Sequence, residues 1–102
     1  MGDTADVIAR GRASFLGLAL GDALGATTEF MTPGEIKAQF KVHRKIIGGG
    51  WLRIKAGHVT DDTEMSLAIA RAITANESWK LEAVAQSFVD WMRSKPIDIG
   101  ST

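Results

Sequence analysis

The sequence has no cysteine, only two histidines and two prolines, and no excess of either charge. The lack of cysteine excludes disulfides, thiolate metal sites and a cysteine nucleophile. Twelve basic side chains balance twelve acidic ones, so charge alone predicts neither a nucleic-acid-binding nor a membrane-binding surface. His43 and His58 do not stand in a paired ligand spacing, so we expect both to be ordinary loop residues.

Long apolar runs are also missing. The longest one, around residues 15–24, is interrupted by Gly17, Gly21 and Asp22 and is much shorter than a membrane span. The N-terminus lacks the basic start and apolar centre of a secretory signal. We therefore expect a soluble, cytoplasmic protein, and a length of 102 residues allows one domain or a piece of one.

What is present is helical periodicity, which predicts four helices and no strand, an all-α fold. The first is expected over residues 4–25, with Thr4 or Asp6 as its cap, and the second over 32–40. Thr32 followed by Pro33 and Glu35 is typical of a capped helix start. The third follows an acidic cluster and ends near residue 76, and the fourth covers 78–94.

Glycines recur in two places. Gly17, Gly21 and Gly25 lie four residues apart and so share one helix face, where we expect another backbone or a ligand to approach closely. The run at residues 48–50 could cradle a phosphate, but it lacks the P-loop spacing. A loop that places Trp51 at the mouth of a site is the alternative.

Two carboxylates in the first half of the chain are candidate site residues. Asp22 and Glu29 lie seven residues apart, which on a continuous helix would place both on one face. The alternative is structural: Asp22 caps a helix or forms a salt bridge, and Glu29 is solvated.

The acidic cluster combines a hydroxyl with two carboxylates in consecutive positions, Thr60, Asp61 and Asp62. Hard oxygen donors of this kind suit Mg²⁺ or Mn²⁺. A helix start also attracts them without a metal, because Thr60 or Asp61 could cap the helix and the second Asp complement its dipole. Asp61 followed by Glu64 also resembles a capping box. The residues alone leave both interpretations open.

Three segments taken together resemble the ADP-ribosylglycohydrolase family. They are GDALG at residues 21–25 with Glu29 after it, TDDTEM at 60–65, and PIDIG at 96–100. Their order and spacing cover essentially the whole chain. The resemblance implies the N-terminal part of an all-α fold built around two divalent cations, Mn²⁺ or Mg²⁺, and hydrolysis of the N-glycosidic bond between ADP-ribose and a protein arginine.

The resemblance also implies roles for individual residues. Thr60, Asp61 and Asp62 match the family's metal ligands, and Glu29 matches its glutamate beside the metals and the substrate. Asp98 and Gly100 match the turn that contacts the ribose and the modified arginine. A carboxylate such as Glu29 or Asp98 could stabilise the positive charge that develops at the anomeric carbon. The sequence does not assign the general base.

Partners follow from the same resemblance. An ADP-ribosylated protein is the implied substrate. The loop GGGWL at residues 48–52 makes the chain most similar to the branch that acts on dinitrogenase reductase, the iron protein of nitrogenase. By this analogy a PII-type signalling protein is a regulator and nitrogen fixation the regulated process.

One departure from the family concerns length. The family is much longer, and its second metal-binding motif, an Asp-x-Asp-Thr near the C-terminus, is absent from this chain. We therefore expect a partial form whose turnover is very low unless another chain supplies the rest, and whose last two helices expose apolar faces. The alternatives are an inactive ADP-ribose-binding or structural remnant, and a helical interaction domain whose acidic cluster is only a cap.

Overall fold

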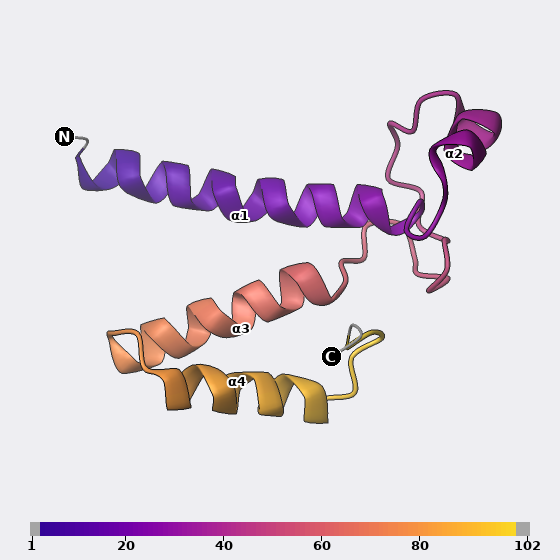
Figure 1. Cartoon of the computed structure of the whole chain (residues 1–102). Helices are drawn as coiled ribbons and strands as arrows, with labels where there is room; N and C mark the ends of the chain where they lie inside the picture. The colour runs from indigo at the N-terminus through magenta and orange to yellow at the C-terminus, as the bar shows by residue number, and fades with distance from the viewer. Residues whose placement is uncertain (1–2, 100–102) are drawn as a thin grey trace. The chain divides into compact units, whose positions relative to one another are not determined.

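A computed structural model describes residues 3–99 and contains four helices: α1 (Thr4–Ala26), α2 (Pro33–Phe40), α3 (Asp61–Asn76) and α4 (Leu81–Arg93) (Figure 1). Within the described residues the β-structure consists of one antiparallel bridge between Gly49 and Ile54. The all-α prediction is therefore confirmed. The chain divides into two compact units, Met1–Val59 and Thr60–Thr102, which are described separately below. No helix within residues 3–99 combines the length and the apolarity that a membrane crossing requires.

The N-cap residue of helix α1 lies one position before the first of the two residues that we expected to cap it. The N-cap is Asp3, whose carboxylate accepts a hydrogen bond of 2.8 Å from the Asp6 amide, so the predicted caps Thr4 and Asp6 are wrong. Asp6 instead forms an exposed salt bridge of 2.8 Å with Arg10, one helical turn later. Such an exposed pair contributes only a few tenths of a kcal/mol.

Most of the surface of α1 is accessible and apolar. Six large apolar side chains of this helix have exposed fractions between 36% and 61%: Val7, Ile8, Phe15, Leu16, Leu18 and Leu20. The glycine face is equally open, because a Cβ built on Gly17, Gly21 or Gly25 meets no atom of the described chain within 4 Å. Among the described residues no other backbone approaches this stripe, and the alternative that we predicted, a ligand close to it, stays a prediction.

Helix α2 begins as predicted. The Thr32 hydroxyl accepts a hydrogen bond of 3.2 Å from the Glu35 amide, and the Glu35 carboxylate accepts one of 3.3 Å from the Thr32 amide. This reciprocal capping box, with Pro33 at the first helical position, satisfies two amides that would otherwise lack partners. The helix ends at Phe40, and Lys41 follows with φ 60°.

The glycine run at residues 48–50 shapes a close junction with the end of α1. All three glycines have φ between 70° and 75°, a region that side chains strongly disfavour. A Cβ on Gly48 would lie 2.5 Å from the Ile54 carbonyl oxygen, and one on Gly50 would collide with the Ala26 carbonyl oxygen. The buried Thr27 hydroxyl donates a hydrogen bond of 2.8 Å to the Gly48 carbonyl. The run therefore serves backbone packing, and nothing in its geometry indicates a phosphate cradle.

Helices α3 and α4 pack together as a hairpin. Small side chains face the interface, and Ala68, Ala72 and Val84 are buried. The Ser87 hydroxyl of α4 donates a hydrogen bond of 2.8 Å to the Ala68 carbonyl of α3. The predicted exposure of apolar side chains on these helices is found at three positions, with exposed fractions of 37% to 68%: Ile73, Leu81 and Met92.

Candidate functional site

Glu29, the candidate carboxylate of the first unit, lies in a turn and not on a helix. Because α1 ends at Ala26, the continuous helix that would align Asp22 with Glu29 on one face does not exist. The turn is held by hydrogen bonds of 3.0 Å from the Thr28 amide to the Gly25 carbonyl and from the Met31 amide to the Thr28 carbonyl. Asp22 and Glu29 are both half-buried.

The residue after Glu29 adopts an unusual conformation. Phe30 has φ 64°, which is strained for an aromatic side chain, and 78% of its surface is exposed. Its ring meets that of Trp51 edge to face, with the ring centroids 5.6 Å apart, and Trp51 is 62% exposed. The glycine loop therefore does place Trp51 on the surface, beside the turn that carries Glu29.

The candidate residues of the second unit begin α3. Thr60 is the N-cap residue and is 6% exposed, and Asp61 and Asp62 are the first two helical residues. The Thr60 side chain makes no capping hydrogen bond, so a capping role does not account for this buried hydroxyl. Asp61 lies inside the helix and cannot be its cap. Both carboxylates nevertheless stand where the helix dipole favours negative charge.

Glu64 does not complete the capping box that its spacing suggested. Its carboxylate accepts a hydrogen bond of 2.6 Å from the Trp91 indole nitrogen of α4. This contact ties the first turn of α3 to the end of α4. No local pattern indicated this contact, because Trp91 belongs to an apolar stripe and lies 27 residues from Glu64.

The remaining predicted residues lie beyond α4 or in loops. Asp98 is half-buried in the segment that follows the helix, and Gly100 lies outside the described residues. The His43 ring nitrogen Nε2 lies 2.7 Å from the Leu24 carbonyl oxygen, and His58 is exposed. Both histidines are loop residues, as predicted.

The chemistry of the donors at the start of α3 fits a hard divalent cation. A hydroxyl and two carboxylates in consecutive positions offer only oxygen ligands. They do not make a complete cage: within residues 3–99 no three His, Asp or Glu side chains are gathered where they could hold a metal ion by themselves. Any cation here would need further oxygens from water, substrate or additional protein.

The comparisons with known proteins agree with one another on a single family. The model of one protein family, ADP-ribosylglycohydrolase, matches residues 3–102. The ADP-ribosyl-[dinitrogen reductase] glycohydrolase of Rhodospirillum rubrum is 54% identical over 93 residues, which are 91% of this chain and 32% of that protein. The ADP-ribosylarginine hydrolase Tri1 of Pseudomonas putida (strain GB-1) is 34% identical over 84 residues, 82% of this chain and 21% of the relative.

A third similar protein is a putative ADP-ribosyl glycohydrolase of Acanthamoeba polyphaga mimivirus, 37% identical over 97 residues. These residues cover 91% of this chain and 29% of the viral protein. The chain thus spans about a third or less of the length of the curated relatives that it matches.

Proposed function

The chain belongs to the ADP-ribosylglycohydrolase family, and from this membership we propose that it supplies the N-terminal part of an enzyme that removes ADP-ribose from protein arginine. The observation that carries the proposal is the match over residues 3–102, a range that contains Glu29, Thr60, Asp61 and Asp62. Relatives named as hydrolases of ADP-ribosylarginine support the choice of bond.

The proposed reaction is hydrolysis of the N-glycosidic bond. Water adds its oxygen to the anomeric carbon of the ribose, the bond to the arginine nitrogen breaks, and that nitrogen receives a proton. The products are ADP-ribose and unmodified arginine. Positive charge develops on the ribose as the bond breaks, and a carboxylate beside it stabilises that charge. Glu29 and Asp98 are the carboxylates that we assign to this task.

We assign the oxygens of Thr60, Asp61 and Asp62 to two divalent cations, Mn²⁺ or Mg²⁺. When bound, such cations supply positive charge that orients the ribose hydroxyls and activates water. Asp61 and Asp62 both stand in the first helical turn, at the end of α3 where the helix dipole favours negative charge. Asp98 and Gly100 complete the assignment as contacts to the ribose and the arginine.

For the protein substrate we propose dinitrogenase reductase carrying ADP-ribose on an arginine. The supporting observation is the 54% identity to the Rhodospirillum rubrum protein, whose name specifies that substrate. A PII-type regulator and a cytoplasmic location remain predictions that accompany this assignment.

The experiment is a chimera in which this chain replaces the matching segment of the Rhodospirillum rubrum relative. We expect the chimera to release ADP-ribose from modified dinitrogenase reductase in the presence of Mn²⁺. In the same chimera, Glu29→Gln should lower kcat about 10²–10⁴-fold, the range typical of a positioned catalytic carboxylate. Glu35→Gln, which removes a carboxylate from α2, is the matched control and should leave kcat within about twofold of the parent chimera. A folded chimera without activity, or one indifferent to Glu29→Gln, would contradict the proposal.

A second candidate applies to the 102-residue chain by itself: an ADP-ribose-binding remnant without turnover. The incomplete set of metal donors among residues 3–99 favours it. Calorimetric titration with ADP-ribose, together with an assay for its release from modified arginine, distinguishes the two candidates. Binding without release supports the remnant, and release at the rate of the complete relative excludes it.

A further inference from the structure

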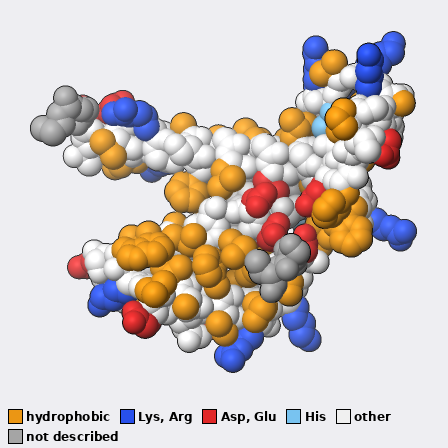
Figure 2. Space-filling view, in the orientation of Figure 1, with side chains coloured by type: hydrophobic (Ala, Val, Ile, Leu, Met, Phe, Trp, Pro, Cys, Tyr) orange, Lys and Arg blue, Asp and Glu red, His pale blue; other side chains and the backbone are white. Residues whose placement is uncertain are grey.

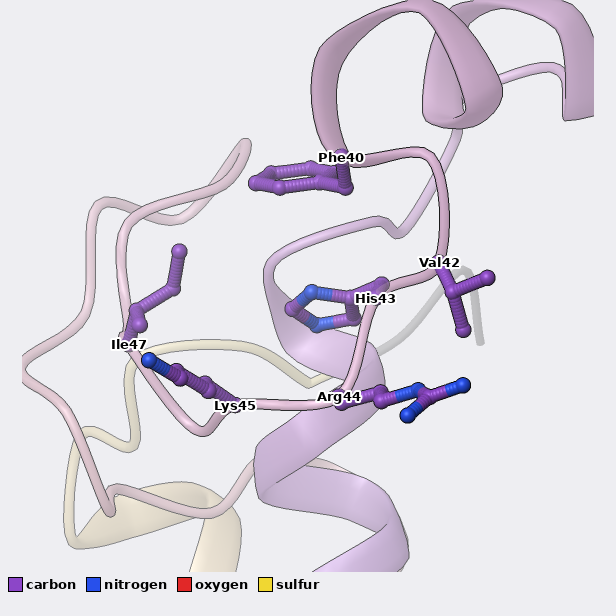
Figure 3. A pocket seen from close by; sticks show the side chains of 6 residues that line it. All are labelled: Phe40, Val42, His43, Arg44, Lys45 and Ile47. Atoms are coloured by element: carbon purple, nitrogen blue, oxygen red, sulfur yellow. The ribbon is translucent and has the colours of Figure 1, made fainter.

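A pocket of about 300 Å³ lies in the first unit, in the segment that joins α2 to the glycine loop. Its lining consists of three apolar and three basic or imidazole side chains: Phe40, Val42, His43, Arg44, Lys45 and Ile47 (Figure 3). No acidic residue lines it, and none of the residues that we assign to hydrolysis takes part. The volume is at the lower end of the range for small-molecule sites.

The pocket is built on a strained turn. Lys41 has φ 60° and ψ −69°, and the Val42 amide donates a hydrogen bond of 2.7 Å to the Phe40 carbonyl two residues earlier. These values define the γ-turn with positive φ, which is rare because it is strained. Strain of this kind persists only where the surrounding structure enforces it, and it gathers at binding and switch sites. Here it reverses the chain directly between two lining residues.

His43 fixes the pocket to the end of α1. Its Nε2 lies 2.7 Å from the Leu24 carbonyl oxygen, and because a carbonyl can only accept, Nε2 must carry the proton. The imidazole also lies against the Phe40 ring, with the centroids 4.9 Å apart and the planes tilted by 45°. The imidazole is thereby held by a contact outside the pocket lining, and the Phe40 ring packs against the imidazole.

The lining separates into an apolar part and a cationic edge. Figure 3 shows Phe40 above the His43 imidazole and Ile47 to its left, with Lys45 extending toward Ile47, while Arg44 and Val42 project to the right. Lys41, Arg44 and Lys45 carry three positive charges within five residues of a chain whose net charge is zero. Figure 2 shows Lys and Arg side chains gathered around α2 and the loop that follows it.

We propose that this pocket binds a small anion that carries a flat ring, of the class of a nucleoside monophosphate. The ring lies against the apolar part formed by Phe40, His43 and Ile47, where it gains from aromatic contact. The phosphate meets the ammonium of Lys45, which extends toward Ile47 and binds phosphate by charge-assisted hydrogen bonds. Inorganic phosphate alone would leave the apolar walls without a partner, and an uncharged ring would leave the cationic edge without one. We therefore expect both to bind more weakly than a ligand that combines the two groups.

The test is calorimetric titration of the complete 102-residue chain with AMP, adenosine and inorganic phosphate in turn. We expect AMP to bind with a Kd below about 1 mM and the other two at least about tenfold more weakly. In two-dimensional NMR, the chemical-shift changes that AMP causes should be largest for the amides of residues 40–47. Amides close to Leu24 should also shift, because His43 contacts the Leu24 carbonyl.

Two substitutions decide which side chains are responsible. Lys45→Ala should weaken AMP binding about tenfold, since it removes one charge-assisted contact from a partly solvated edge. Lys55→Ala, which removes an exposed lysine of the same unit outside the pocket lining, is the matched control and should leave the Kd unchanged. Phe40→Leu keeps an apolar side chain but removes the ring, and should bring the affinities for AMP and phosphate closer together.

Three outcomes would overturn the proposal. The first is no AMP binding in a sample that circular dichroism shows to be folded. The second is equal weakening by Lys45→Ala and Lys55→Ala, which indicates unspecific charge attraction. The third is displacement of AMP by a Glu-rich peptide of equal affinity, which would make the segment a docking surface for an acidic protein.

Discussion

The two units hold their candidate residues by different means. In the first unit, Glu29 lies in a turn that follows α1. The glycine loop packs against this end of α1 through glycines with positive φ and through the hydrogen bond from Thr27 to Gly48. In the second, Thr60, Asp61 and Asp62 begin a helix that packs against α4. The first arrangement depends on backbone conformations that few residues can adopt, and the second on side-chain packing. We therefore expect the stability of the first unit to be most sensitive to substitution of its glycines, and that of the second to loss of side-chain contacts between α3 and α4.

The largest effect is expected at Gly50. Gly50→Ala adds a Cβ that collides with the Ala26 carbonyl oxygen and lies 3.0 Å from the Thr27 Cα, at a residue with φ 70°. Conformational strain and overpacking together should destabilise the first unit by about 3 kcal/mol. Gly49→Ala is the matched control, because Gly49 has φ 75° but an added Cβ meets nothing within 4 Å. It should cost only about 1 kcal/mol.

Amide hydrogen exchange, resolved by residue, measures both variants. The loss of protection should be confined to residues 3–59 and be greater for Gly50→Ala. If Gly50→Ala and Gly49→Ala lowered protection equally, the close packing of Gly50 against the end of α1 would contribute nothing to the stability of the first unit.

A smaller effect is expected in the second unit. Trp91→Phe keeps the aromatic ring but removes the hydrogen bond to the Glu64 carboxylate. Because that acceptor is charged and both groups are half-buried, the loss should be about 1.5 kcal/mol. Trp79→Phe changes a tryptophan that is 60% exposed and should cost less than about 0.5 kcal/mol. Urea denaturation followed by circular dichroism compares them, and similar midpoints would contradict the assigned role of Trp91.

The smallest effect concerns the start of α2. Thr32→Ala removes the hydroxyl of the capping box and should reduce the stability of this helix by about 1 kcal/mol. Thr32→Ser retains a hydroxyl and should behave as the parent chain. The measurement is the exchange rate of the Glu35 amide, which donates to Thr32. If the exchange rate of the Glu35 amide were unchanged in Thr32→Ala, the capping box would contribute nothing to the stability of α2.

Local features were predictable from the sequence, and long-range ones were not. The four helices, the capping box at Thr32 and the position of Thr60–Asp62 at a helix start depend on neighbouring residues. The box predicted for Asp61 and Glu64 failed because Thr60, not Asp61, is the N-cap residue of α3. The Glu64 carboxylate instead accepts a hydrogen bond from Trp91, 27 residues away. The alignment of Asp22 with Glu29 failed because α1 ends at Ala26, where the chain turns toward the glycine loop.

The site itself was inferred mainly from resemblance. Spacing alone left Thr60, Asp61 and Asp62 between a cap and a metal site. The structure removes the side-chain cap but leaves the favourable helix dipole in place. The regular spacing of the glycines in α1 suggested that a backbone or a ligand approaches them closely. The described residues supply no such backbone, and the ligand stays a prediction.

The central claim is that the start of α3 forms part of a divalent-cation site, and Mn²⁺ titration by calorimetry tests it most directly. The 102-residue chain is titrated with and without ADP-ribose, beside the double variant Asp61→Asn/Asp62→Asn. Glu82→Gln/Asp90→Asn removes two exposed carboxylates of α4 and serves as the matched control. The account predicts micromolar Mn²⁺ binding that survives in the control and is lost in the Asp61/Asp62 variant. Equal binding by all three folded proteins, or none by the parent chain, would contradict it.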